Sequence, residues 1–177
     1  MVTTEAADRF LAAPLLSKLT PAERLAVLGA LVEGRAEAGA TLLEQGEPND
    51  RLAFLIEGAA TIVRTFPGGR EEVVAALSAP AVFGDLSFFR DAAPLASVRA
   101  DTAVRLLTLD HPAHEALRLD SPRTSEALAL AVLRVMAERF DLLDRKLTDF
   151  IARGLDNPPR PSELARFRAR LFDESNA

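Results

Sequence analysis

Short apolar runs recur about every ten residues between positions 33 and 109, and this recurrence constrains the fold more than any other feature. Residues typical of turns separate the runs, including a Pro-Gly-Gly triplet at 67–69 and glycines at 39, 58 and 84. Several short strands with such turns between them are typical of an antiparallel barrel or sandwich. The runs that we expect to form strands are residues 41–43, 52–56, 60–63, 73–77, 96–98 and 104–109.

A helical segment is expected before the β region. Leucines at helical spacing lie within residues 10–32. Thr20, Pro21 and Glu23 form a start signal, with Thr20 as the cap, proline in the first turn and Glu23 reaching back as a capping box.

A second helical segment is expected after the β region. A short helix at about 112–119 leads to Pro122, where a long helix begins that runs to about residue 153. Gly154 and the prolines that follow end this helix. We expect one domain over residues 1–153, then a tail at 154–177 that is either a short helix or disordered.

Composition excludes several classes of protein. The 177 residues contain no cysteine, which removes disulfides, cysteine-ligated iron–sulfur clusters and thiol redox chemistry. The net charge of −5 argues against a nucleic-acid-binding domain. No apolar run approaches the roughly 20 residues of a membrane span, and the first residues lack the pattern of a secretory signal. We therefore expect a cytoplasmic protein that does not contact a membrane.

The long helix carries an apolar seam with the alternating spacing of a coiled coil. A second apolar set, formed by Leu128, Val132, Val135 and Leu142, covers the neighbouring face. One set would pack on the chain's own β domain and the seam on a second copy, which predicts a homodimer; the alternative is a monomer that buries both. The predicted dimer interface is Ala129, Leu133, Met136, Phe140, Leu143, Leu147 and Phe150.

The order of elements, together with one segment, resembles the cyclic-nucleotide-binding domain of the catabolite-activator (Crp/Fnr-like) family. The most specific residues are Phe-Gly-Asp-Leu-Ser-Phe-Phe at 83–89 and Pro-Leu-Ala-Ser-Val-Arg-Ala at 94–100. Weaker support comes from Gly39, from Gly46-Glu47 and Asp50-Arg51-Leu52, and from residues 56–60. The resemblance implies an antiparallel β-roll, or jelly roll (double-stranded β-helix), with flanking helices and a long dimerisation helix.

The resemblance also implies a phosphate-binding cassette. In the family, a Phe-Gly turn opens a one-turn helix whose backbone N–H groups receive the cyclic phosphate. The acid after the glycine accepts a hydrogen bond from the ribose, and an arginine pairs with the phosphate. The long helix presents groups to the base, a role that would fall to Arg139 here. The candidate ligand-binding residues are Phe83, Gly84, Asp85, Leu86, Ser87, Pro94, Leu95, Ala96, Ser97 and Arg139.

The cassette departs from the family pattern at two places. Asp85 stands where the family usually has the longer glutamate, and the arginine slot holds Pro94 or Leu95, depending on where a one-residue gap is placed. Neither residue pairs with a phosphate. Arg90 or Arg99 remains as an alternative source of the charge. We expect standard cyclic nucleotides to bind weakly or not at all, and no other cofactor is indicated.

Other candidate sites have plainer interpretations. His111 and His114 lack a third ligand at metal-binding spacing, so we interpret them as surface and cap positions and predict no metal site. No nucleophile or base motif accompanies Asp85, so we expect no enzyme activity.

Three functions remain open. The first is a dimeric sensor or regulatory module, which acts on a partner protein, and the second is a protein-interaction or structural dimer that has lost ligand binding. The third is a transcription regulator that acts through its tail or a partner. The 24 residues after Arg153 are too few for the winged helix-turn-helix of the family's transcription factors, so we expect no DNA binding by the chain itself.

Overall fold

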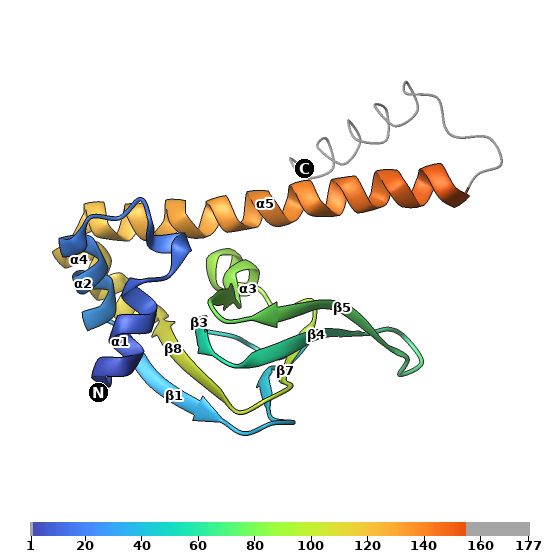
Figure 1. Ribbon diagram of the computed structural model, residues 1–177, viewed down its shortest axis with the longest axis horizontal. Helices are drawn as coiled ribbons and strands as arrows, with labels where there is room; N and C mark the ends of the chain where they lie inside the picture. Colours follow the sequence, from blue (N-terminus) through green and yellow to red (C-terminus); the bar gives the residue numbers. More distant parts are fainter. Residues whose placement is uncertain (1, 155–177) are drawn as a thin grey trace. The chain divides into compact units, whose positions relative to one another are not determined.

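A computed structural model of the chain describes residues 2–154, and its centre is a β-roll of two antiparallel four-stranded sheets (Figure 1). One sheet has the order β1-β8-β3-β6 and the other β2-β7-β4-β5. The mainly-β prediction is confirmed. The strands are β1 Val32–Ala36, β2 Thr41–Leu43, β3 Arg51–Glu57, β4 Ala59–Thr65, β5 Glu71–Ser78, β6 Ala81–Phe83, β7 Ser97–Ala100 and β8 Val104–Asp110.

The core of the β-roll lies between the inner faces of the two sheets. Alternation along each strand sends every second side chain inward. On β7, for example, Val98 and Ala100 belong to the buried cluster, whereas Arg99 lies on the other face. The buried cluster consists of Ala53, Leu55, Ala60, Leu77, Phe83, Val98, Ala100, Val104 and Leu106.

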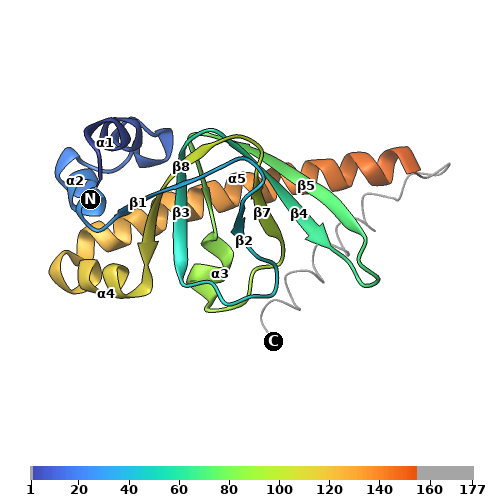
Figure 2. The same cartoon turned by 90° about the horizontal axis from the view of Figure 1, so that it is seen from below.

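Three short helices precede the roll: α1 Thr4–Leu11, a 3₁₀ turn Pro14–Leu16 and α2 Pro21–Gly29. The capping box is confirmed, because Thr20 accepts a hydrogen bond from the Glu23 N–H and the Glu23 carboxylate accepts one from the Thr20 N–H. Phe10 of α1 packs edge-on against Phe54 of β3, with ring centroids 5.2 Å apart. Figure 2 shows α1 and α2 beside the end of the sheet that carries β1.

A buried arginine holds the N-terminal segment on the roll. Arg105 of β8 donates hydrogen bonds to Glu5 (2.6 Å), to the Thr3 hydroxyl (2.7 Å) and to Glu33 of β1 (3.0 Å). The Thr3 N–H donates to the other oxygen of Glu33 at 2.7 Å. This N–H, more than the nearby arginine, lowers the pKa of Glu33 to about 2.

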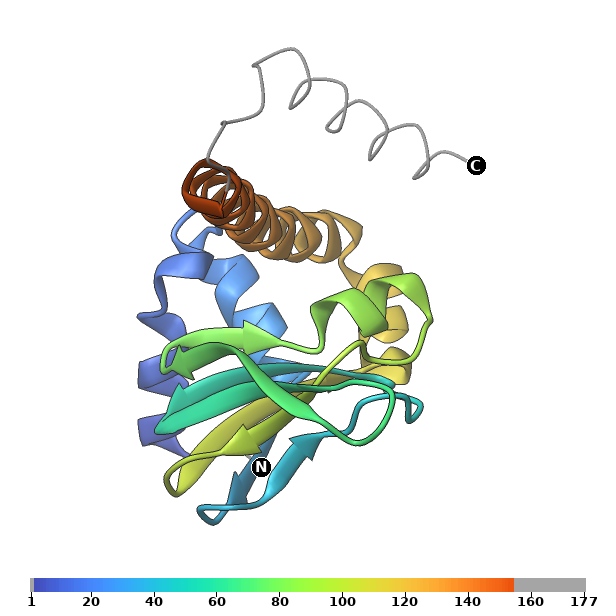
Figure 3. The same cartoon turned by 90° about the vertical axis from the view of Figure 1, so that its right-hand side faces the viewer.

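Within the described residues, two helices follow the roll: α4 His111–Asp120, capped by the Asp110 side chain, and α5 Pro122–Gly154. In Figure 3, α1 and α2 (blue) lie on one side of the strands, and α3 and α4 (green and gold) on the other. No helix among residues 2–154 is long and apolar enough to cross a membrane. Of the predicted tail at 154–177, Gly154 is the last residue of α5, and residues 155–177 lie outside the described residues.

The chain divides into two compact units, with the boundary inside α5 after Leu133. Leu128 and Val132, which begin the second apolar set, are fully buried in the first unit. In the second unit, Leu142 is 52% exposed, so burial of this set does not extend that far along the helix. Along the predicted seam, Leu133, Phe140 and Leu143 are exposed, whereas Ala129, Met136 and Leu147 are partly buried, and the Phe150 side chain lies outside the described part.

Candidate ligand-binding cassette

Gly84 makes the sharp turn from β6 into the short helix α3 Asp85–Arg90. Its φ is +77°, in the left-handed region that side chains with a Cβ avoid. A Cβ at this position would lie 2.7 Å from the Arg51 carbonyl oxygen. The turn thus needs glycine both for its backbone angle and for the close approach of β3.

Asn49 ties this turn to the loop before β3. Its Nδ2 donates to the Arg51 carbonyl and to the Ser87 hydroxyl, both at 2.8 Å. The Ser87 hydroxyl in turn donates to the Gly84 carbonyl at 3.0 Å. The role of Asn49 was not predicted, because a polar residue in a Gly-Glu-Pro-Asn-Asp loop carries no signal of a partner 38 residues away.

Asp85 is 5% exposed and occupies the first position of α3. Its Oδ1 accepts a hydrogen bond from the N–H of Leu86 at 3.1 Å. Phe83, Ser87 and Phe88 around it are also buried, whereas Leu86 and Phe89 are exposed.

The segment after α3 is held against the loop that follows β2. The carbonyl of Pro94 accepts from the Gly46 N–H at 3.0 Å, and the Ser97 hydroxyl accepts from the Gln45 N–H at 2.9 Å. Pro94 and Ser97 are buried, Ala96 is partly buried and Leu95 is 55% exposed. The two residues at the predicted arginine slot, Pro94 and Leu95, are both uncharged.

The two alternative arginines lie elsewhere. Arg90 is exposed at the C-terminal end of α3. Arg99 lies on the face of β7 opposite Val98 and Ala100, and forms a two-point ion pair with Glu71 of β5. This pair raises the pKa of Arg99 and lowers that of Glu71.

The histidines pack on the cassette helix, which corrects their interpretation as surface and cap positions. The His111 ring lies 4.4 Å from the Phe88 ring and donates through Nε2 to the Phe88 carbonyl at 3.1 Å. The His114 ring and the Ser125 hydroxyl of α5 are hydrogen-bonded. Burial has the larger effect in lowering the pKa of His114, and the charge of His111 has the smaller effect. Among residues 2–154, no three side chains are grouped so as to hold a metal ion.

The structure thus brings residues 83–87 and 94–97 together around the loop between β2 and β3. Arg139 is partly buried on α5 and belongs to the second unit.

Comparison with known proteins agrees with this geometry. Residues 33–121 match the cyclic nucleotide-binding domain family. The CRP-like cAMP-activated global transcriptional regulator of Mycobacterium tuberculosis is 35% identical over 113 residues, which is 64% of this chain and 49% of the regulator. Glutaminase 1 of Bradyrhizobium diazoefficiens is 33% identical over 82% of this chain, but that match covers only 22% of the glutaminase.

A solved structure gives the same result. The N-terminal domain of a transcriptional regulator from Streptomyces coelicolor superimposes with a TM-score of 0.64 at 30% identity, over 77% of this chain and 95% of that domain. The chain spans about half, or less, of the curated proteins it matches. Fold, cassette and sequence similarity together show that the chain belongs to the cyclic nucleotide-binding domain family.

Proposed function

We propose that this protein is a dimeric regulatory module whose cassette keeps the family backbone but binds cyclic AMP and cyclic GMP weakly or not at all. The observation that carries the proposal is the uncharged arginine slot, where Pro94 is buried and Leu95 is exposed. The ligand of such a module is then a molecule other than a standard cyclic nucleotide.

The position of Arg99 supports the same conclusion. A phosphate inside the β-roll would need a cation from an inward-facing position, and Arg99 faces outward beside Thr61, its partner in register on β4. The N–H groups of α3 and the helix dipole supply only part of the stabilisation of an anion.

Relatives support a regulatory role. One is a cAMP-activated transcriptional regulator, and another carries a similar segment as a small part of a glutaminase. A domain that occurs beside such different activities fits a module that regulates a partner. The acidic net charge of −5 opposes the electrostatic attraction on which non-specific DNA binding depends.

Calorimetry with cyclic AMP and cyclic GMP tests the proposal. Loss of a buried, hydrogen-bonded charge partner typically costs about 2–5 kcal/mol, or roughly 30-fold to several thousand-fold in affinity. The variant Leu95→Arg with Asp85→Glu, or Pro94→Arg with Asp85→Glu, should recover part of this affinity. Leu119→Arg, which adds the same charge at an exposed position of α4, is the matched control. Tight binding by the wild type would refute the proposal.

A protein-interaction dimer is the second candidate function. It is favoured by three exposed apolar side chains on α3 and the loop after it, Leu86, Phe89 and Leu95, which are 45%, 40% and 55% exposed. The same titrations separate the two candidates, because a β-roll with no room for a ligand gains no affinity when the arginine is restored.

A further inference from the structure

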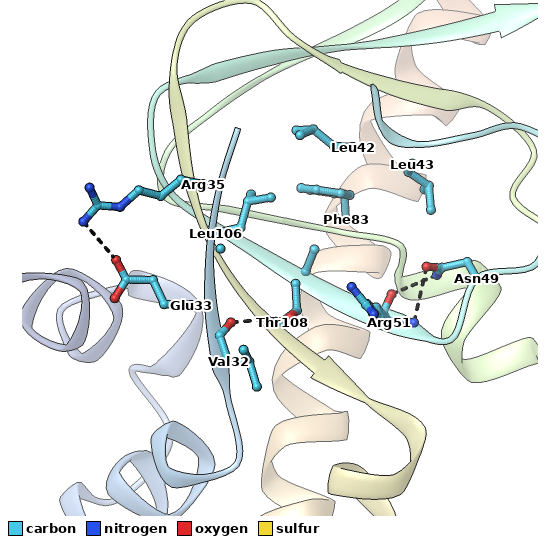
Figure 4. Close-up of a pocket in the computed structure, with 12 residues that line it drawn as sticks. Val32, Glu33, Arg35, Leu42, Leu43, Asn49, Arg51, Phe83, Leu106 and Thr108 are labelled. Carbon is cyan, nitrogen blue, oxygen red and sulfur yellow. Dashed lines mark hydrogen bonds and ion pairs between the residues drawn. The ribbon is translucent and has the colours of Figure 1, made fainter. Parts of the chain in front are cut away.

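The β-roll contains a cavity of about 230 Å³ at the end of the inter-sheet space where β1 and β2 lie (Figure 4). Its apolar walls come from both sheets, with Leu42 and Leu43 from β2 and Phe83 and Leu106 from β6 and β8. Of the candidate cassette residues, the cavity shares only Phe83. It is therefore a different space from the cassette.

Two small residues leave this space open. Gly34 pairs with Leu106, and Ala53 pairs with Thr108 and Phe83, so these positions share the inner face of one sheet. A Cβ built on Gly34 meets no atom within 4 Å, and the backbone there is not left-handed. The pocket opens to solvent, since the lining residue Val32 is 59% exposed, and apolar surface left in contact with water loses the free energy that burial provides. A ligand that occupied the space would recover contacts that the strands do not make themselves.

One end of the cavity is polar and positively charged. Arg51 lies there beside Asn49 (Figure 4). Among residues 2–154, Arg51 has one ion pair, which joins its Nε to Asp50 at 3.5 Å, and both side chains are about two-thirds exposed. Such a pair is weak and exchangeable, and a guanidinium matches a carboxylate in shape and charge.

The other two charged lining residues, Glu33 and Arg35, flank Gly34 on β1 and so lie on the opposite face of the strand from Gly34. Glu33 and Arg35 form an ion pair at 3.5 Å, which Figure 4 shows to one side of the apolar side chains. Glu33 also accepts hydrogen bonds from Thr3 and Arg105. The charge that an incoming ligand meets is therefore that of Arg51.

We propose that this cavity is a second binding site, which takes a small aliphatic or aromatic carboxylate with its apolar part between the sheets and its carboxylate at Arg51. The volume lies below the roughly 300–1,000 Å³ of sites for drug-sized ligands. It exceeds the roughly 150 Å³ of an apolar cavity that accepts benzene. A molecule of the size of hexanoate or benzoate fits this range. Because Asn49 also bonds to Ser87 of α3, such a ligand lies next to the cassette.

Titration of hexanoate into ¹⁵N-labelled protein tests the site, with hexan-1-ol as the uncharged probe. Hexanoate should shift the backbone amides of Gly34, Ala53 and Leu106. Gly34→Leu should fill the cavity, abolish these shifts and raise the unfolding temperature, and Gly34→Val should reduce them partly. Gly29→Leu is the matched control, since Gly29 is exposed on α2 and its added Cβ also meets nothing within 4 Å.

Arg51→Gln tests recognition of the carboxylate. It should weaken hexanoate about two- to fivefold, as for an exposed ion pair, and leave hexan-1-ol unchanged. The site is refuted if about 10 mM hexanoate leaves the cavity amides unmoved, a concentration that detects even millimolar affinity, or if Gly34→Leu binds like the wild type. If the wild type and Arg51→Gln bound hexanoate equally well, as they are expected to bind hexan-1-ol, recognition of the carboxylate by Arg51 would be refuted. None of these results depends on whether cyclic nucleotides bind.

Discussion

Arg99 of β7 donates two hydrogen bonds to the carboxylate of Glu71 on β5, with Nη2 to Oε1 at 2.6 Å and Nη1 to Oε2 at 2.7 Å. The two strands are not neighbours, because β4 lies between them. The ion pair therefore crosses the outer face of the sheet and directs the guanidinium away from the inner face. Arg99 is close to the cassette in sequence, but in the folded chain its guanidinium is already paired with Glu71.

Breaking this ion pair should not create a phosphate site. In Glu71→Ala, Arg99 loses its partner but keeps its outward position on β7, so affinity for cyclic AMP should change by less than about twofold, which is under 0.5 kcal/mol. Arg99→Ala should likewise leave the weak affinity unchanged. Calorimetry measures both, and a large loss in Arg99→Ala would show that Arg99 does contact the nucleotide.

Gly84→Ala should destabilise the protein more than the same change at Gly68. Both glycines have positive φ, at +77° and +91°, which costs an alanine about 1–2 kcal/mol. Only at Gly84 would the new Cβ overlap a backbone atom, the Arg51 oxygen, whereas at Gly68 it meets nothing within 4 Å. Overpacking of this kind adds about 1–3 kcal/mol. Urea unfolding of the two variants measures the difference, and equal losses would mean that α3 moves freely away from β3.

Most of the fold was predictable because its signals are local. Six of the eight strands coincide with apolar runs, and a capping box starts α2. β1 was not predicted as a strand, since Val-Glu-Gly-Arg-Ala contains a glycine and two charges. β6 has only three residues and follows a proline. Strand propensity in such segments is weak, and pairing with β8 and β3 decides their structure.

The candidate site was predictable only in part. The cassette segment and its empty arginine slot follow from the order of residues along the chain. The partners of Arg99 and Arg105 do not, because Glu71 and Glu33 lie 28 and 72 residues away. Their meeting depends on strand order and register, which no local pattern specifies. The packing of the two histidines on Phe88 was not predictable for the same reason, because it depends on where α4 lies relative to α3 in the folded chain.

Stability should fall in acid as Glu33 becomes protonated. Its pKa in the folded protein is about 2, against 4.5 for the ordinary side chain. A depressed pKa means that the carboxylate stabilises the fold fully above about pH 4.5 and that this contribution disappears as the pH falls through about 2. Glu33→Gln should therefore be less stable than the wild type at neutral pH, and the difference should shrink over this interval.

Urea unfolding at several pH values between 7 and 2 checks this, with Glu37→Gln as a control at an exposed position after β1. The control should follow the wild type throughout. A constant difference between Glu33→Gln and the wild type across the whole range would contradict the role assigned to the Glu33 charge.

Two aspartates in the predicted seam of α5 should convert a dimer to monomers. Leu143 is 62% exposed and Leu147 is partly buried, and both belong to the apolar spacing that predicts a partner helix. Burial of each leucine would contribute about 1.5–3 kcal/mol, and the aspartates add buried like charges. Leu143→Asp with Leu147→Asp should therefore weaken association at least about 100-fold. The control is Leu25→Asp with Leu119→Asp, two exposed leucines on α2 and α4. Analytical ultracentrifugation should give a dimer for the wild type and the control, and a monomer for the seam variant. A monomeric wild type at micromolar concentration would refute the dimer, and dissociation of the control would show that the seam is not what holds it.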